Sequence, residues 1–453
     1  MKRHLFLLAA AGLLASALTV SAKIADNIQR TQVGTIDVLT LTTGVKDVVT
    51  LRGTLPVGNV AAPESNPALA RLTGSMLDKG TVTKDKFAIA SQLESVGASL
   101  SFSVGNELLT ISGKCLKKDV PLVISLIAEQ LRRPAFSPEE FAKVQKRYVG
   151  ALQRSLDDTD TRASDAFTRA VYPLGHPNRQ PPTEELIAAI KGTTLDAVKA
   201  FHAEYYGPAH LRLILVGDVE ATTVQAEVGQ AFAGWTGGKE AARPGAVGGD
   251  LDAPRDQTVF MADKTNVSVV WGMATGLRYR DPEALALRVA TNALGGGFAM
   301  RLMNTVRNEE GLTYGIYSFV SNDNISDGDW RIWANFSPEL LEKGIASTRR
   351  QITKWHESGI TAEELAQRKT DMAGSYKVGL STTTGMANNI MNTLVRGYDV
   401  NFLDAYPEQS RKPSNSRPAT NSGALEVGAC LQAMVRCRAG PWSSRECRSS
   451  FVA

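Results

Sequence analysis

The chain repeats itself, and this repeat limits the possible folds more than any other feature of the sequence. The segment NPALARLTGSMLDKG, from Asn66, has a counterpart in DPEALALRVATNALGGG, from Asp281. The segment FSPEEFAKVQKRYVGAL, from Phe136, matches ITAEELAQRKTDMAGSY, from Ile360, in the same order. Similarity between two stretches at a constant offset indicates a duplicated structural unit. Since 453 residues are also too many for one compact core, we expect two homologous domains.

Each copy shows the same succession of strand and helix patterns. The stretch LSFSVGNELLTISG alternates with period two, which is typical of a strand pair, whereas VPLVISLIAEQL has helical periodicity. These patterns predict an α+β fold of two homologous α/β domains, each a mostly antiparallel sheet with helices over one face. We assign residues 27–233 to the first domain and 255–408 to the second. Residues 234–254 are rich in glycine and proline and are interpreted as a linker.

The first 22 residues differ from the rest of the chain. They combine a basic start, a short apolar run and the small residues Val20-Ser21-Ala22. This pattern predicts a secretory signal peptide that is cleaved after Ala22, and hence a periplasmic protein. The alternative is an uncleaved membrane anchor. The apolar run is short for a membrane span, and no second stretch is long enough, so we expect no stable span in the mature form.

The last 45 residues also look foreign to the repeat. The first half closes with a helix and the strand LRLILVGDV, but residues 409–453 are rich in serine, arginine and proline and lack clear periodicity. We expect an atypical, disordered tail that is foreign to the fold, such as a segment translated from a shifted reading frame. The alternative is a disordered extension that belongs to the native protein. Without a closing strand, the second sheet would keep an exposed edge.

Charge and cysteine content exclude several functions. The net charge of +4 comes from Lys2, Arg3 and a basic surplus after Gln409, so the body is slightly acidic and gives no reason to expect nucleic-acid binding. One cysteine, Cys115, lies in the body. The spacing of the other three matches no zinc-site pattern; these are Cys430, Cys437 and Cys447.

Several segments resemble the pitrilysin/insulinase family of zinc peptidases in its two-domain form, like mitochondrial processing peptidase subunits and their bacterial relatives. The segments are MLDKGT, YPLGHPNRQPPTEELIAAI and FHAEYYGPAHLRLILVGDV, and the resemblance covers roughly Val33 to Glu408. Zinc enzymes of the family carry His-x-x-Glu-His on the helix before the first segment, and a further glutamate ligand about 75 residues on.

The resemblance places those motif positions on residues that cannot perform the same chemistry. The two histidine positions hold Arg71 and Ser75, the glutamate position holds Gly74, and the distal glutamate position falls at Gly150–Ala151. A guanidinium offers no lone pair to a metal, and glycine cannot act as a general base. The resemblance therefore implies a chain with no metal site and no catalytic residue of its own.

The second half keeps a different part of the family's machinery. In the family, an arginine and a tyrosine seven residues apart face the zinc, hold the substrate backbone and stabilise the developing oxyanion. Arg307 and Tyr314 match that pair, whereas the first half has Leu93 and Leu100 at the equivalent positions. The alternative is a surface charge and a strand aromatic. The nearby run Gly295, Gly296 and Gly297 resembles the glycine-rich loop of the family's non-catalytic subunits; a plain flexible loop is the alternative.

The remaining histidines do not suggest another metal site. The sequence HAEYYGPAH crosses a helix end and a Gly-Pro turn, which is unlike a regular ligand set. We interpret the four histidines beyond the N-terminal segment as surface, loop or capping residues; they are His176, His202, His210 and His356.

These expectations combine into one hypothesis. The chain is a non-catalytic subunit of a heterodimeric zinc metallopeptidase that acts on peptides. It is inactive alone and supplies Arg307 and Tyr314 to the zinc site of a homologous partner, which holds the only zinc. The alternatives are a catalytically inert binding or assembly protein of the same fold, and a gene product damaged at its C-terminus.

Overall fold

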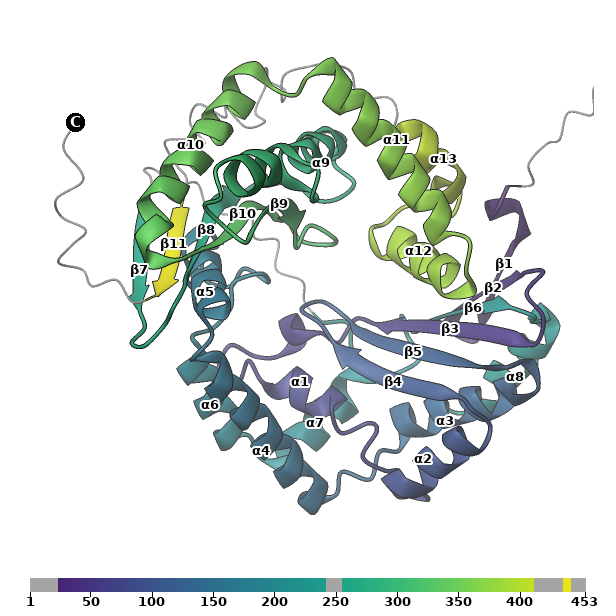
Figure 1. The fold of residues 1–453 in the computed structure, drawn as a ribbon. Coiled ribbons are helices and arrows are strands. Elements are labelled where there is room, and N and C mark those ends of the chain that lie inside the picture. Colours follow the sequence, from purple (N-terminus) through teal and green to yellow (C-terminus); the bar gives the residue numbers. More distant parts are fainter. Residues whose placement is uncertain (1–22, 242–254, 411–434, 441–453) are drawn as a thin grey trace, which may run out of the picture.

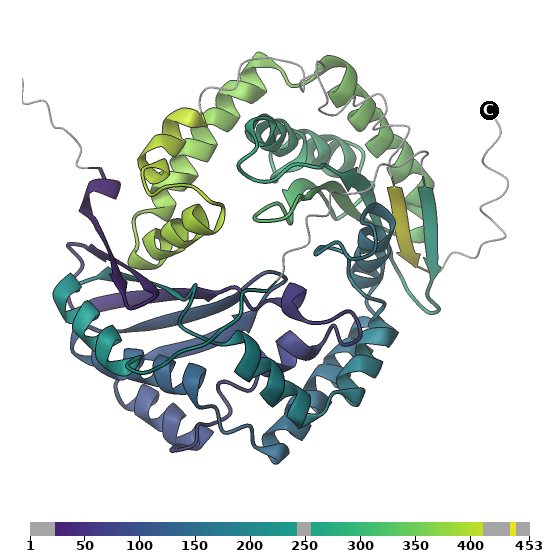
Figure 2. The same ribbon diagram turned by 180° about the vertical axis from the view of Figure 1, so that it is seen from behind.

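The computed structural model describes residues 23–241 and 255–410, and the backbone of residues 435–440. The expected signal peptide, residues 242–254 of the expected linker and the rest of the expected tail lie outside the described residues. Figure 1 shows the two halves of the chain facing each other, and Figure 2 shows the same arrangement from behind.

The first half contains a six-stranded sheet with the strand order β1-β2-β6-β3-β5-β4. Only β2 and β6 run parallel; every other neighbouring pair is antiparallel. The strands are β1 (Ile28–Val33), β2 (Ile36–Thr42), β3 (Val48–Leu55), β4 (Ser99–Val104), β5 (Leu109–Leu116) and β6 (Arg212–Gly217). The helices of this half are α1 (Leu69–Gly74), α2 (Lys86–Ser95), α3 (Val120–Arg132), α4 (Pro138–Ser155), α5 (Thr159–Val171), α6 (Thr183–Gly192), α7 (Leu195–Tyr205) and α8 (Ala221–Ala231).

The second half contains a five-stranded sheet with the order β7-β11-β8-β10-β9. Its strands are β7 (Arg255–Phe260), β8 (Val267–Ala274), β9 (Gly315–Ser321), β10 (Asp329–Phe336) and β11 (Val435–Gly440). The helices are α9 (Pro282–Gly295), the π-helical segment η4 (Met303–Glu309), α10 (Leu341–Ser358), α11 (Ala362–Gly379), α12 (Thr383–Val395) and α13 (Phe402–Gln409).

Apart from β1, which has no counterpart in the second sheet, the two sheets have the same topology, which confirms the α+β fold. Strand β11 runs parallel to β7 and antiparallel to β8, as β6 does to β2 and β3. The expectation that the tail contributes no strand is therefore wrong for residues 435–440. Residues 435–440 all pair with β7, and residues 435–439 also pair with β8, so the second sheet has its closing strand in spite of an unpromising sequence.

The two halves exchange helices, which the sequence did not predict. Helix α5 belongs to the first half in sequence but packs on β7, β8 and β11, and α12 belongs to the second half but packs on β3 and β6. Figure 1 shows both helices against the opposite sheet. The prediction of helices over one face is thus incomplete, because each sheet is covered on its other face by a helix from the other half.

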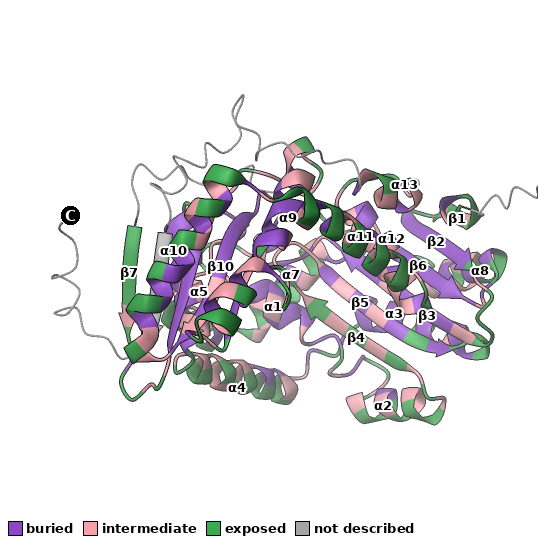
Figure 3. Ribbon diagram, turned by 45° about the horizontal axis from the view of Figure 1, so that its top comes forward, coloured by how far each residue is buried: buried purple, intermediate pink, exposed green. Residues whose placement is uncertain are grey.

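Strand β6 illustrates why both faces must be covered. Its residues are almost all buried, and they alternate between two apolar clusters. Leu213 and Leu215 pack with the helices of the first half, whereas Ile214 and Val216 pack with Ile390 of α12. A strand that is apolar on both faces needs a cover on each side. Figure 3 shows the buried strands between partly exposed helices.

None of the described helices is both long and apolar enough to cross a membrane.

Candidate functional site

Helix α1 carries the positions of the family's metal motif, and it is short. It begins at Leu69 and ends at Gly74, with Ser75 as its C-cap. The apolar residues of the helix and of the turn after it belong to the core: Leu69, Leu72, Met76 and Leu77 are all buried. The helix is therefore anchored by packing although its polar positions carry no ligands.

Gly74 occupies a place where no side chain fits. A Cβ atom built on Gly74 would lie 2.3 Å from Cγ2 of Val104 on β4 and 3.3 Å from Cδ1 of Leu109 on β5. It would also lie 3.5 Å from the hydroxyl of Tyr206, which is buried and has no hydrogen-bond partner among the described residues. The position that would need a glutamate is thus closed by the sheet.

Ser75 contacts the helix that carries the distal ligand position. Its Oγ lies 2.7 Å from the hydroxyl of Tyr148 on α4. Ala151 is one turn further along the same helix and is exposed. The structure therefore brings α1 and α4 together, but it places a serine, a tyrosine and an alanine where a metal would need histidines and a glutamate.

Arg71 lines a cavity of about 610 Å³ between α1, α4, α5 and the loop before α6. No hydrogen bond or ion pair joins its side chain to another described residue. The cavity walls also include Glu64, Asp165 and Arg169, so charges of both signs are present. Burial raises the pKa of Asp165, although a hydrogen bond from Thr183 opposes this shift.

The donor set at these positions does not fit a zinc ion. A guanidinium, a glycine and a hydroxyl that is engaged with a tyrosine cannot form a tetrahedral site of nitrogen, sulfur or carboxylate ligands. Among the described residues, no group of three or more His, Cys, Asp or Glu residues is placed to hold a metal ion.

Arg307 and Tyr314 lie together on the second half, and the cavity at Arg71 includes neither of them. Arg307 is on η4, and its Cζ lies 5.2 Å from the centre of the Tyr314 ring and 5.6 Å from that of Phe298. Tyr314 is 87% exposed and Phe298 is 67% exposed. The guanidinium therefore lies beside two open aromatic rings, and its N–H groups make no hydrogen bond or ion pair with another described residue.

The glycine run before this pair has a packing role that sequence reasoning missed. Gly295 ends α9, and a Cβ there would lie 2.7 Å from the backbone nitrogen of Ser318 on β9. A Cβ at Gly296 would lie within 2.4 Å of Asn292, whereas Gly297 has free space. Gly295 thus allows α9 to end close to β9, Gly296 leaves room for Asn292 of α9, and Gly297 would meet only Met300 Cγ, at 4.0 Å.

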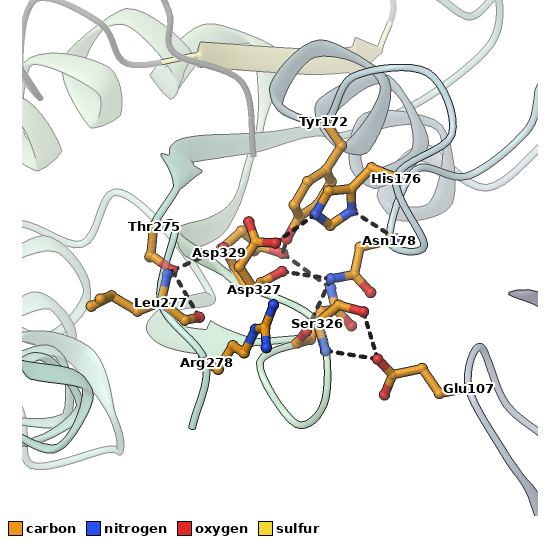
Figure 4. A network of polar contacts seen from close by, with 12 residues as sticks. Glu107, Tyr172, His176, Asn178, Thr275, Leu277, Arg278, Ser326, Asp327 and Asp329 are labelled. Carbon is orange, nitrogen blue, oxygen red and sulfur yellow. Dashed lines mark hydrogen bonds and ion pairs between the residues drawn. The ribbon is translucent and has the colours of Figure 1, made fainter. Parts of the chain in front are cut away.

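A buried polar network joins the two halves, and its residues were not recognised in the sequence (Figure 4). The hydroxyl of Tyr172 donates to Asp329 of β10 at 2.7 Å, and burial is the main reason that the pKa of Tyr172 is raised. Nearby, Ser326 donates both its backbone N–H and its hydroxyl to Glu107, at 2.8 and 2.6 Å. These contacts link segments that are more than 150 residues apart in the sequence.

His176 belongs to this network and is not a surface residue. Its side chain is completely buried, and its Nε2 lies 3.0 Å from Oδ1 of Asp327. Its Nδ1 accepts the backbone N–H of Asn178, so Nε2 is the nitrogen that carries the proton toward Asp327. The interpretation of His176 as a simple loop residue is corrected: it lies in a loop, but it fastens that loop to the other half.

The other histidines have ordinary surroundings. The Nε2 of His202 lies 2.8 Å from the carbonyl oxygen of Leu131, and burial lowers the pKa of this imidazole. His210 is half exposed and lies 3.8 Å from Glu240. His356 is on α10, and it belongs to no cluster of metal-binding side chains among the described residues.

Two profiles of one peptidase family match the chain, and the second of them begins within the first half. Residues 37–180 match the profile described as insulinase (peptidase family M16), and residues 193–372 match the profile described as the peptidase M16 inactive domain. An uncharacterized zinc protease of Streptomyces coelicolor is 26% identical over 340 residues, which is 73% of each chain. A Helicobacter pylori protein described as a non-peptidase homolog is 25% identical and matches 79% of this chain and 81% of its own.

Solved structures show the same fold. A peptidase M16 inactive domain from Pseudomonas fluorescens superposes with a TM-score of 0.82 at 23% identity, and covers 92% of this chain and 99% of its own. A protease from Helicobacter pylori superposes with a TM-score of 0.81 at 17% identity, with coverage of 91% and 99%.

Proposed function

Since the chain belongs to the insulinase family of peptidases, family M16, we propose that it is the non-catalytic subunit of a heterodimeric zinc metallopeptidase that acts on peptides. The homologous partner subunit carries the zinc ion. This chain lends Arg307 and Tyr314 to the partner's site and is exported to the periplasm.

The proposal depends on one observation: the zinc ligands of the family are absent, whereas its arginine and tyrosine pair is present. The metal positions hold Arg71, Gly74 and Ser75, and Gly74 is closed by Val104. By contrast, Arg307 and Tyr314 are adjacent, and Tyr314 is open to solvent. An unpaired guanidinium beside an exposed phenol can donate hydrogen bonds to a bound peptide, as the proposed role requires.

The chemistry of the pair suits a peptide carbonyl. The guanidinium stays charged and presents its donors in a fixed plane, and the phenol adds one neutral O–H donor. Donors fixed in advance stabilise the negative charge that develops on a carbonyl oxygen under attack. The cation–π contact with Phe298 and Tyr314 holds the guanidinium near this surface without using its N–H groups.

The relatives support a role without independent turnover. The Helicobacter pylori relative is described as a non-peptidase homolog, and residues 193–372 of this chain match an inactive-domain profile. Within the proposal, these descriptions apply to a subunit that works only when it is paired.

The proposal is tested by mixing the purified chain with a zinc-bearing homologue from the same source. We expect cleavage of a fluorogenic peptide by the mixture and none by this chain alone. Arg307→Ala and Tyr314→Phe should each lower kcat by about 100-fold to 1,000-fold, the range for removal of an oxyanion donor.

Two matched substitutions serve as controls. Arg349 is an exposed arginine on α10, and Tyr205 is a partly exposed tyrosine on α7. Arg349→Ala and Tyr205→Phe should leave the activity of the pair unchanged. Equal activity of the Arg307 variant and the wild type would refute the assigned role. Peptide binding by the mixture with no turnover would instead identify an inert binding protein.

A further inference from the structure

A second pocket lies on the outer side of α4 and is strongly basic. It has a volume of about 620 Å³ and lies beside the C-terminal end of α6; Figure 1 shows the two helices next to each other. Its lining contains four cationic side chains and no acidic one. The lining residues are Gln145, Lys146, Arg147, Val149, Gly150, Gln153, Arg154 and Lys191.

A fixed contact brings the cation from α6 to this pocket. The side-chain amide of Gln145 donates to the carbonyl oxygens of Ile190 and Thr193, at 2.7 and 3.0 Å. These two carbonyl groups flank Lys191 in the sequence. The last turn of α6 is therefore attached to α4 by the two hydrogen bonds from Gln145. These bonds hold Lys191 beside the basic turns of α4, although the ammonium group of Lys191 takes no part in them.

Gly150 forms the centre of the pocket. Lys146 and Arg147 precede it by four and three residues, and Gln153 and Arg154 follow it by three and four, so all four surround it on the helix surface. A Cβ at Gly150 would meet only Nη1 of Arg154, at an ordinary distance of 3.6 Å. Packing thus does not require glycine here, although glycine costs about 1 kcal/mol relative to alanine in a helix.

The four cations have no counter-charges in the described chain. No hydrogen bond or ion pair engages the side chains of Lys146, Arg147, Arg154 or Lys191 there; Arg147 only stacks near the ring of Tyr148, at 5.3 Å. The acidic residues of the same helices lie at the opposite ends. In α4, Glu139 and Glu140 belong to the first turn and pair with Lys143 and Lys86.

We propose that this pocket binds a ligand that bears phosphate groups. Two planar guanidinium groups and two ammonium groups around a small depression match several negative charges that lie close together. One or two phosphate groups supply such a charge in less space than separate carboxylates. The source is either a small phosphorylated molecule or the head group of an anionic lipid. This inference does not depend on the proposed function.

The test measures binding of two probes to the full-length protein. Titration calorimetry with inorganic pyrophosphate reports a small phosphorylated ligand. Co-sedimentation with phosphatidylglycerol vesicles, compared with phosphatidylcholine vesicles, reports a lipid head group. We expect saturable binding of at least one probe that weakens as salt is added. The double variant Arg147→Gln/Arg154→Gln should lose affinity by about tenfold or more, because it removes two charge-assisted contacts.

Two further variants separate the pocket from general surface charge. Lys143→Gln removes a lysine of the same helix that is already paired with Glu139 and Glu140. This variant should therefore bind the probes with the affinity of the wild type. Gly150→Glu places a carboxylate in the depression and should abolish binding while the protein stays folded in a thermal melt. Binding of pyrophosphate identifies a small ligand, and binding of anionic vesicles alone identifies a lipid. No saturable binding of either probe, or equal affinity in the double variant, would overturn the proposal.

Discussion

Replacement of Gly74 by alanine tests whether the sheet closes the motif position of α1. A new Cβ would meet Val104 Cγ2 at 2.3 Å, well inside van der Waals contact. Valine has one side-chain torsion with few allowed rotamers, so it cannot easily move aside. Since Gly74 lies at the end of the helix and does not have a positive φ, alanine would otherwise be acceptable there.

Two effects of opposite sign determine how far Gly74→Ala changes the free energy of unfolding. Overpacking a core position costs about 1–3 kcal/mol. Alanine in place of glycine stabilises a helix by up to about 1 kcal/mol, and by less at a helix end. We therefore expect Gly74→Ala to destabilise the protein by about 1–2 kcal/mol. In a Val104→Ala background the clash is absent, and the same substitution should be neutral or stabilising by up to about 1 kcal/mol.

The assay is a double-mutant cycle. Urea unfolding of the wild type, the two single variants and the double variant is followed by tryptophan fluorescence, and thermal melts supply a second measure. A change of 1 kcal/mol in a domain of 150–250 residues shifts Tm by about 2–4 °C. We expect a coupling free energy of about 1–3 kcal/mol between the two positions.

The outcome that would refute this reasoning is additivity. If Gly74→Ala has the same effect with valine or alanine at position 104, the short distance does not limit the site. Stabilisation by Gly74→Ala in the wild-type background would lead to the same conclusion, since helix propensity would then outweigh the steric conflict.

Three other predictions concern the fold. Phe167→Ala on α5 should destabilise the protein by about 3–5 kcal/mol, because this ring is fully buried between the halves; an unfolding midpoint equal to that of the wild type would contradict the helix exchange. Burial alone would raise the pKa of Asp37, but hydrogen bonds from Arg30 and Arg212 hold it below 3.8. These hydrogen bonds therefore stabilise the folded protein fully above pH 3.8, and the stabilisation is lost as the pH falls through the lower pKa of the folded state. Asp37→Asn should thus weaken the fall of the free energy of unfolding at acid pH. An unchanged fall at acid pH would count against these bonds. Burial raises the pKa of the Cys115 thiol to about 11, so at pH 8 it should react with a thiol reagent only after urea is added. Rapid reaction of the folded protein would show that the thiol is accessible.

The sequence was most informative where a residue type alone decides the chemistry. A guanidinium at Arg71 and a missing side chain at Gly74 rule out the family's metal ligands in any conformation. The family resemblance indicated that Arg307 and Tyr314 form a pair, which their spacing alone did not, and the structure places the two side chains in contact. Features that depend on packing were harder to predict: the close approach of Gly295 to β9 has no local sequence signature.

Periodicity shows that a segment buries one face, but it does not show against which partner. The sequence by itself determined the duplication, the α+β class and the loss of the zinc ligands, because these follow from repeated patterns and from the chemistry of individual side chains. Only the tertiary structure decided that α5 and α12 exchange sheets, that residues 435–440 complete the second sheet, and that His176 is fastened to Asp327. Each of these features depends on contacts between segments far apart in the chain, where the complementary surface, and not the local pattern, selects the partner.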